Sequence, residues 1–191
     1  KIEAFEGLGT GNVKLKKTGT NDSFINLNSA AGIITATTLA VATTEVMALS
    51  NILPSVESFS GGSDDILDLS ALSEDLFVDI AFNSIWDKSN QSNFVEINGY
   101  ENFIGGLGSD TIVGFADNSV GIVGGQGVDI LYGSEIDYLR YDLEENYRTS
   151  GNASGVKVNL EKQTATDTYE NSDIINGFGN IKGTSLNDQL V

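Results

Sequence analysis

The sequence predicts an all-β protein built from stacked coils of short strands. Two nine-residue segments, GGLGSDTIV at residues 105–113 and GGQGVDILY at residues 124–132, match the pattern G-G-x-G-x-D-x-U-x, in which U is a large aliphatic residue. Looser copies of this pattern recur along the chain. The 22 glycines, the single proline and the abundant Thr, Ile and Val favour turns and strands over helices.

Each residue type in the nonapeptide has a physical role. The glycines allow a tight turn with positive φ, and the Asp adds a hard anionic oxygen of the kind that Ca²⁺ prefers alongside carbonyl oxygens. The x-U-x tripeptide is a short strand whose apolar side chain can be buried only if coils stack. Asp110 and Asp129 are 19 residues apart (129 − 110), and a coil of two nonapeptides needs 18, so the two Asp residues can stack on one edge of successive coils.

Incomplete nonapeptides supply further candidate ligands. Their turns depart from the full pattern but keep an acidic residue, and the candidates are Asp22, Asp65, Asp137 and Asp188. Between the two complete copies, the segment FADNSVGIV at residues 115–123 carries Val120 at the sixth position instead of Asp. We therefore expect the site on that side to be weakened or missing.

Alternation of apolar and polar residues predicts half-buried strands at residues 24–27, 76–80 and 156–160. Residues 37–49 fit either a short helix or a pair of strands. Residues 142–148 fit one helical turn, and residues 142–155 depart most from the repeat, so we expect an irregular loop insertion there. Residues 1–191 are expected to form a single elongated repeat module, most regular at residues 105–132, and to be a piece of a longer chain.

Acidic residues outnumber basic ones by 27 to 10, which gives a formal net charge of −17. Nucleic acid is a poor partner for such a chain, whereas divalent cations are a good one. The absence of Cys and His excludes disulfides and the usual zinc ligand sets. No apolar run of 18 residues is present, so we expect no membrane span.

The two nonapeptides and the looser repeats resemble the RTX, or hemolysin-type calcium-binding, family of Gram-negative bacteria and cyanobacteria. The segment VKVNLEKQTATDTYENSDIINGFGNIKGTSLNDQLV at residues 156–191 is also similar to sequences between nonapeptides in large RTX surface proteins. The resemblance implies a right-handed parallel β-roll or β-helix with Gly- and Asp-rich calcium-binding turns. It also implies type I secretion, folding on Ca²⁺ outside the cell, and a location on the cell surface or in the medium.

The resemblance implies calcium ligands residue by residue. Asp110 and Asp129 correspond to the side-chain ligands, and the backbone oxygens of the two turns complete the shell, at Gly105, Leu107, Gly124 and Gln126. The expected partners are calcium ions and the neighbouring domains of the parent chain, and no catalytic residue is expected.

Three alternatives remain open. The Asp residues can instead cap Gly-rich turns by accepting hydrogen bonds from the backbone. A β-helical polysaccharide lyase or epimerase fragment would need a catalytic pair, but the adjacent carboxylates Asp64–Asp65 and Glu144–Glu145 point to opposite faces if they lie in strands. An adhesin segment that binds glycans or a cell surface would use the aromatic residues Trp86, Tyr138, Tyr141 and Tyr147.

Overall fold

Strands dominate the computed structural model of the chain. It describes the backbone of the strands at residues 13–16, 24–26, 35–37 and 56–60, and it describes residues 66–70, 72–114, 117–148 and 151–191, apart from the side chains of 92–94. Within this described part, the one helix is the short α2 (Tyr141–Asn146). The predicted all-β class is therefore confirmed.

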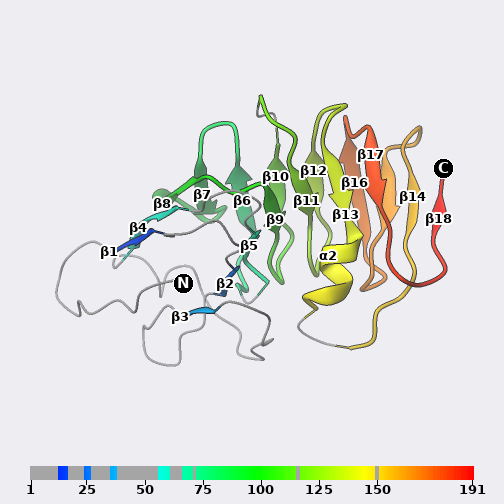
Figure 1. Cartoon of the computed structure of the whole chain (residues 1–191), viewed down its shortest axis with the longest axis horizontal. Coiled ribbons are helices and arrows are strands. Elements are labelled where there is room, and N and C mark those ends of the chain that lie inside the picture. Colours follow the sequence, from blue (N-terminus) through cyan, green and yellow to red (C-terminus); the bar gives the residue numbers. More distant parts are fainter. Residues whose placement is uncertain are drawn as a thin grey trace.

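The described strands form two sheets (Figure 1). The larger sheet has eleven strands in the described part of the chain, in the order β1 (Val13–Lys16), β4 (Val56–Ser60), β8 (Asn90–Asn98), β7 (Ser84–Asp87), β6 (Leu76–Asp79), β10 (Thr111–Val113), β12 (Ile130–Tyr132), β16 (Ser172–Asn176), β15 (Thr164–Thr166), β14 (Lys157–Asn159) and β18 (Gln189–Leu190). The smaller sheet has seven described strands, in the order β17 (Asn180–Lys182), β13 (Tyr138–Arg140), β11 (Gly121–Val123), β9 (Asn102–Ile104), β5 (Ile66–Asp68), β2 (Phe24–Asn26) and β3 (Thr35–Thr37).

From β9 to β13 the chain alternates between the two sheets. Strands β9, β11 and β13 pair in parallel in the smaller sheet, while β10 and β12 pair in parallel in the larger one. One strand in each sheet, with the turns that join them, therefore makes one repeat, and successive repeats lie side by side along the long axis in Figure 1. Parallel pairing requires such crossings, because two neighbouring parallel strands cannot be joined by a tight hairpin.

Antiparallel pairing occurs in two meanders of the larger sheet and between β2 and β3 in the smaller sheet. Strands β6, β7 and β8 form one antiparallel meander, and β16, β15 and β14 form another. Strands β14 and β15 of the second meander belong to residues 141–171, which separate β13 from β16 and which we call the insertion. It begins with α2 and ends where β16 returns to pair in parallel with β12. The loop expected at 142–155 lies inside this insertion, and the helical turn expected at 142–148 corresponds to α2.

The alternating segments form strands as predicted. Residues 24–27, 76–80 and 156–160 contain β2, β6 and β14, and the side chains of β6 alternate between buried and half-buried. The segment 37–49, for which helix and strand pair were both open, lies outside the described residues apart from Thr37 at the end of β3.

The core is built from the central residue of each short strand. In the larger sheet the row across β6, β10, β12 and β16 consists of Val78, Ile112, Leu131 and Ile175, and in the smaller sheet the row across β5, β9, β11 and β13 consists of Leu67, Phe103, Ile122 and Leu139. All eight are buried. Each repeat thus contributes one large apolar side chain from each strand, and stacking buries it between its neighbours.

The first prediction concerns this core. Leu131→Ala removes a fully buried side chain at the centre of the larger sheet's row and should lower the free energy of unfolding by about 2–5 kcal/mol. Val128→Ala, at a side chain that is 54% exposed, is the matched control and should change it by less than about 0.5 kcal/mol. Denaturant unfolding of both variants in the same buffer measures the difference, and equal midpoints would contradict the proposed core.

Candidate metal centre

The two complete nonapeptides place their turns next to each other. Residues 105–110 lead into β10 and residues 124–129 lead into β12, and these strands are parallel neighbours. Asp110 and Asp129 directly precede the paired residues, so they hold the same place in successive repeats. This is the arrangement that their 19-residue spacing (129 − 110) predicts.

Two glycines show how closely atoms pack within a turn and between successive turns. A Cβ atom on Gly124 would lie 2.1 Å from Oδ2 of Asp129, so any other residue would displace this carboxylate. Gly127 has a φ of +131°, and a Cβ there would lie 2.1 Å from the carbonyl oxygen of Gly108 in the preceding turn. The glycines of the pattern are therefore required both by the backbone conformation and by contact between successive turns.

The predicted carbonyl ligands belong to these two facing turns. The Gly124 carbonyl oxygen lies against Gly105, where a Cβ atom would be only 2.0 Å away. The N–H of Gln126 donates to the carbonyl oxygen of Gly106 at 3.0 Å. Backbone oxygens and carboxylates are thus close together within the paired turns.

Three aspartates form a column along one edge of the larger sheet, and we call Asp110, Asp129 and Asp173 the aspartate column. Oδ1 of Asp110 accepts the N–H of Leu76 at 2.7 Å, and Oδ1 of Asp129 accepts the N–H of Asp110 at 2.7 Å. Oδ1 of Asp173 accepts the N–H of Asp129 at 3.0 Å. Each carboxylate therefore ties its own repeat to the preceding one, and all three are buried.

The second oxygens of the column are not equivalent. Oδ2 of Asp110 accepts the N–H of Gly106 at 2.6 Å. Oδ2 of Asp129 and Oδ2 of Asp173 are buried and have no hydrogen-bond partner. A buried carboxylate oxygen without a partner costs free energy, and a bound cation is one means of removing that cost.

Burial and mutual repulsion raise the pKa values of the column. Burial raises the pKa of Asp129 to about 9, and the negative charges of Asp110 and Asp173 contribute to that rise. Burial also raises the pKa of Asp110 and of Asp173 to about 7 each. Backbone hydrogen bonds and the nearby Lys88 ammonium hold the pKa of Asp110 down. The strongest demand for a positive charge is therefore at Asp129.

The insertion adds acidic side chains near the aspartate column. Glu144 on α2 is buried, and burial together with the charge of Asp167 raises its pKa to about 8. The hydroxyl of Tyr141 is buried without a hydrogen-bond partner, and its pKa is raised by burial and by the charge of Asp173. Burial raises the pKa of Asp167 to about 6. The interior beside Asp129 is consequently polar and acidic.

These features fit calcium better than a metal bound only by side chains. Among the described residues, no three Asp or Glu side chains gather closely enough to hold a metal ion by themselves. An ion at Asp129 would therefore need backbone carbonyl oxygens from the turns in addition to carboxylates. Mixed carbonyl and carboxylate shells are typical of Ca²⁺, and Oδ2 of Asp129 is a carboxylate oxygen without a hydrogen-bond partner.

Asp137 lies on the other sheet, away from the column. It precedes β13, and its Oδ1 accepts the N–H of Val120 at 2.9 Å. Its Oδ2 accepts the N–H of Ser134 at 2.8 Å and the Ser134 hydroxyl at 3.0 Å. Val120 holds the equivalent place in the preceding repeat, so no second carboxylate stacks on Asp137 from that side. The expected lack of an Asp on this edge is thus visible in the strand register.

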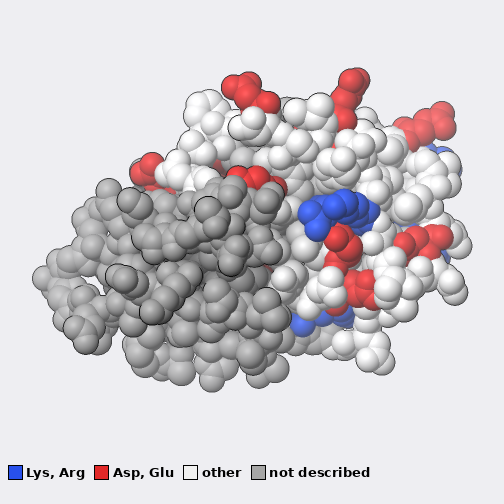
Figure 2. Space-filling model, viewed as in Figure 1, with Lys and Arg blue, Asp and Glu red and all other residues white. Residues whose placement is uncertain are grey.

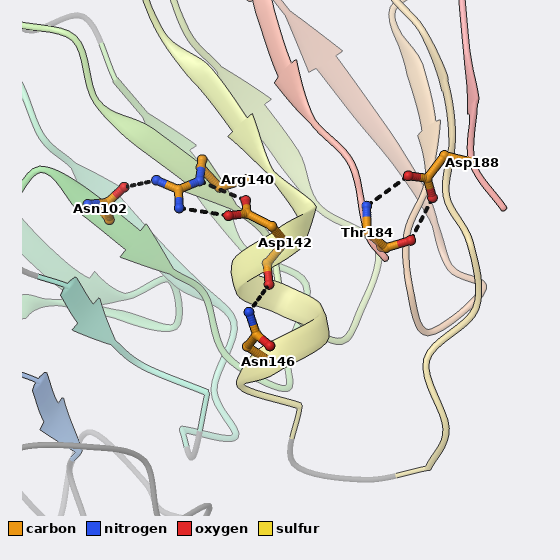
Figure 3. A network of polar contacts seen from close by, with 6 residues as sticks. All are labelled: Asn102, Arg140, Asp142, Asn146, Thr184 and Asp188. Atoms are coloured by element: carbon orange, nitrogen blue, oxygen red, sulfur yellow. Dashed lines mark hydrogen bonds and ion pairs between the residues drawn. The ribbon is translucent and has the colours of Figure 1, made fainter. Parts of the chain in front are cut away.

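Asp188 precedes the terminal strand β18 and is also separate from the column. Its Oδ1 accepts the N–H of Val156 at 2.9 Å and its Oδ2 accepts the N–H of Thr184 at 2.8 Å, while the Thr184 hydroxyl adds a third bond (Figure 3). Both oxygens are satisfied, as in a capped turn. The other two candidates, Asp22 and Asp65, lie outside the described residues.

Asp173 and Glu144 were not among the residues predicted from the sequence. Asp173 begins DIIN, which keeps the D-x-U-x half of the nonapeptide with Ile175 at the buried position. The preceding TYENS has none of the pattern's glycines, and the 44-residue interval to Asp129 (173 − 129) hides the repeat. Only the D-x-U-x half would have indicated Asp173. The sequence drew attention to Glu144 only as one of two adjacent carboxylates, Glu144–Glu145, and not as part of a metal site.

The outer surface carries a different balance of charge. Figure 2 shows acidic side chains spread over the described part of one face, with fewer basic ones among them. Arg140 forms a two-pronged contact with Asp142, at 2.7 and 2.8 Å, and also donates to Asn102 at 2.7 Å (Figure 3). This guanidinium is therefore engaged on the outside of the smaller sheet and does not neutralise the buried column.

No protein family, curated protein or solved structure matches this chain. In the part of the chain that the structure describes, no helix has the length and apolar character needed to cross a membrane.

The second prediction concerns pH in the absence of calcium. Asp110, Asp129, Glu144 and Asp173 have raised pKa values, so the folded state binds more protons than the unfolded state between about pH 4 and pH 9. The free energy of unfolding should therefore fall as pH rises through this range, by about 1.4 kcal/mol per pH unit for each such proton. Chemical unfolding in excess chelator at a series of pH values measures the slope.

Asp129→Asn removes the group with the highest pKa in the column and should flatten the slope between pH 7 and about pH 9. Glu161→Gln, at an exposed position, removes the same formal charge and should leave the slope as it is in the wild type. A stability that increases with pH over this range would contradict the buried, uncompensated column.

Proposed function

We propose that this chain is a calcium-binding structural module of a secreted or cell-surface bacterial protein. Its biochemical role is to bind Ca²⁺ in the turns that precede the strands of the larger sheet. Its mechanical role is to fold and stiffen outside the cell, where calcium is abundant, and to support the neighbouring domains of the parent chain.

One observation carries this proposal. Asp129 ends the turn of the second complete nonapeptide and accepts an N–H from the first, its carboxylate is fully buried, and its Oδ2 has no hydrogen-bond partner. The alternative in which the Asp only caps its turn explains Asp188, whose two oxygens both accept backbone N–H groups. It does not explain Asp129, where one oxygen is left without a donor. A cation supplies what the backbone does not.

Calcium would act by compensating a buried carboxylate and by neutralising repulsion. Burial raises the pKa of Asp129 most, and the charges of Asp110 and Asp173 in the neighbouring repeats add to the rise. A formal net charge of −17 opposes compaction of the whole chain as well. When bound at Asp129, Ca²⁺ would supply two positive charges where repulsion is greatest. Folding and calcium binding would then be coupled, since an ion that binds only the folded state stabilises it.

The RTX resemblance supports the same conclusion for fold and location. Short parallel strands that alternate between two sheets, each with one buried central residue, are what a β-roll requires. We therefore propose a β-roll for the repeats from β9 to β13, interrupted by the insertion and extended by mixed pairing at both ends. Export by a type I system, and folding after export, belong to the same proposal.

The third prediction tests calcium binding directly. Millimolar calcium should raise the melting temperature of the wild type over that in excess chelator and increase its β-sheet circular dichroism. A stabilisation of about 2.7 kcal/mol is expected at a calcium concentration one hundred times Kd. The double variant Asp110→Asn with Asp129→Asn keeps the side-chain shapes but should lose most of this gain. Melting followed by circular dichroism, with calorimetric titration, measures both effects.

Asp117→Asn is the matched control, because Asp117 is exposed and lies in the next turn of the chain. It should respond to calcium as the wild type does. Identical melting of the wild type in calcium and in chelator would refute the proposed function.

A second candidate function, glycan binding, has one specific observation in its favour. A hollow of about 340 Å³ lies beside β7 and is lined in part by Phe82, Ser84, Trp86 and Gln91. Phe82 is 81% exposed, and the lining combines aromatic rings with uncharged hydrogen-bonding groups, which suits a neutral sugar. Tyr141, which the sequence had also suggested for such a surface, is fully buried and takes no part in it.

The fourth prediction applies to this alternative. If the module binds neutral glycans, Phe82→Ala and Trp86→Ala should each abolish binding on a glycan array in the presence of calcium. Ile136→Ala, at a residue that is 50% exposed, should not. Absence of any glycan signal from the wild type would eliminate this function and leave the structural role.

A further inference from the structure

The partnerless oxygens of Asp129 and Asp173 have a common cause in the geometry of their turns. In the turn of Asp110, Oδ2 accepts the N–H of the residue four positions earlier, Gly106, at 2.6 Å. In the turn of Asp188, Oδ2 accepts the N–H of Thr184, again four positions earlier, at 2.8 Å. Through this hydrogen bond, a backbone N–H of the turn satisfies Oδ2 of the Asp in the same turn. It is absent in the turns of Asp129 and Asp173.

In the turn of Asp129 the corresponding donor is engaged elsewhere. The residue four positions earlier is Gly125, and its N–H donates to Oε1 of Glu144 at 3.2 Å. Oε2 of Glu144 accepts the N–H of Thr168 at 2.8 Å, which holds the carboxylate between the two turns. Glu144 is 2% exposed and comes from α2, the start of the insertion. It thus competes with Asp129 for a single backbone donor.

The same competition recurs in the next turn. The residue four positions before Asp173 is Tyr169, and its N–H donates to Oδ1 of Asp167 at 2.8 Å. Asp167 also belongs to the insertion, and it is buried. Carboxylates of the insertion therefore accept the N–H groups that lie four positions before Asp129 and four positions before Asp173. The two oxygens left without a partner are those of Asp129 and Asp173.

We propose that Glu144 is a positioning residue that keeps the Gly125 N–H away from Asp129 and so leaves Oδ2 of Asp129 free to bind calcium. This inference rests on the proposed function. The insertion then has a role beyond connecting β13 to β16. It converts a carboxylate that would cap its own turn into one that can bind an ion, and it leaves the turn of Asp110 in the capped state.

Three variants of Glu144 and its neighbour test the inference. Glu144→Leu removes both acceptor oxygens while filling similar space, so the Gly125 N–H can return to Asp129. Glu144→Gln removes the charge but keeps one acceptor oxygen for Gly125. Glu145→Leu is the matched control, because Glu145 lies on the same helix and contacts Ser185 in the last turn instead.

Calorimetric titration with calcium chloride gives the first readout. Glu144→Leu should weaken calcium binding by about tenfold or more, whereas Glu144→Gln and Glu145→Leu should stay within about threefold of the wild type. The second readout is the amide resonance of Gly125 in calcium-free protein by NMR. It should shift in Glu144→Leu, because its acceptor changes from Glu144 to Asp129, and a merely structural role of α2 would not move it selectively.

The possible outcomes separate calcium binding by the module from the role of Glu144 in it. If the wild type binds no calcium, the proposed function is wrong and this inference is wrong with it. If the wild type binds calcium and Glu144→Leu binds it equally well, only this inference is overturned. If Glu144→Gln loses as much affinity as Glu144→Leu while the Gly125 amide resonance stays at its wild-type position, the effect comes from charge alone, and the competition for the Gly125 N–H is refuted.

Discussion

The structure depends on one interaction, the hydrogen bond from a backbone N–H to the Asp carboxylate of the next repeat. This bond links Leu76 to Asp110, Asp110 to Asp129, and Asp129 to Asp173. It can form only if the carboxylate points inside the turn, so the carboxylate is desolvated. It also brings each carboxylate close to the next one in the column. The bond that aligns the repeats therefore creates the repulsion that opposes their stacking.

The remaining features of the site follow from how the surroundings of Asp110 and of Asp129 compensate this repulsion. At Asp110 the charge is relieved by two backbone donors and by Lys88, whose ammonium donates to the carbonyl oxygen of Ser109 at 2.6 Å. At Asp129 the insertion adds another acidic group, Glu144, and removes a donor. The two nonapeptides match the same sequence pattern, yet only the second leaves a carboxylate oxygen without a hydrogen-bond partner. This asymmetry arises outside the motif itself.

The sequence predicted the features that repeat along the chain, namely the buried residue of each short strand and the position of the Asp before it. The x-U-x tripeptides predicted the buried rows that include Ile112 and Leu131, and the 19-residue spacing (129 − 110) predicted that Asp110 and Asp129 lie in neighbouring repeats. The rest depends on the insertion. Asp173 has lost the glycines that would identify its turn, and Glu144 reaches Gly125 from a helix that interrupts the repeat. Contacts of this kind join residues whose spacing follows no period, so no pattern in a single sequence reveals them.

An Asp at the sixth position of the pattern is therefore not in itself a metal ligand. Asp188 holds that position, and Asp137 holds the equivalent place in a copy that is one residue shorter. Each ties two repeats together with both oxygens satisfied by N–H donors. Neither has an Asp at the equivalent place in the preceding repeat, since Val120 and Val156 occupy those places. Asp129 differs in two respects, because it stacks between two other carboxylates and has lost a turn donor. Stacking places carboxylates close together, so a cation between them would reduce their repulsion. The missing turn donor leaves one carboxylate oxygen that could bind this cation. Only the two conditions together distinguish a candidate calcium ligand from an Asp that caps its turn.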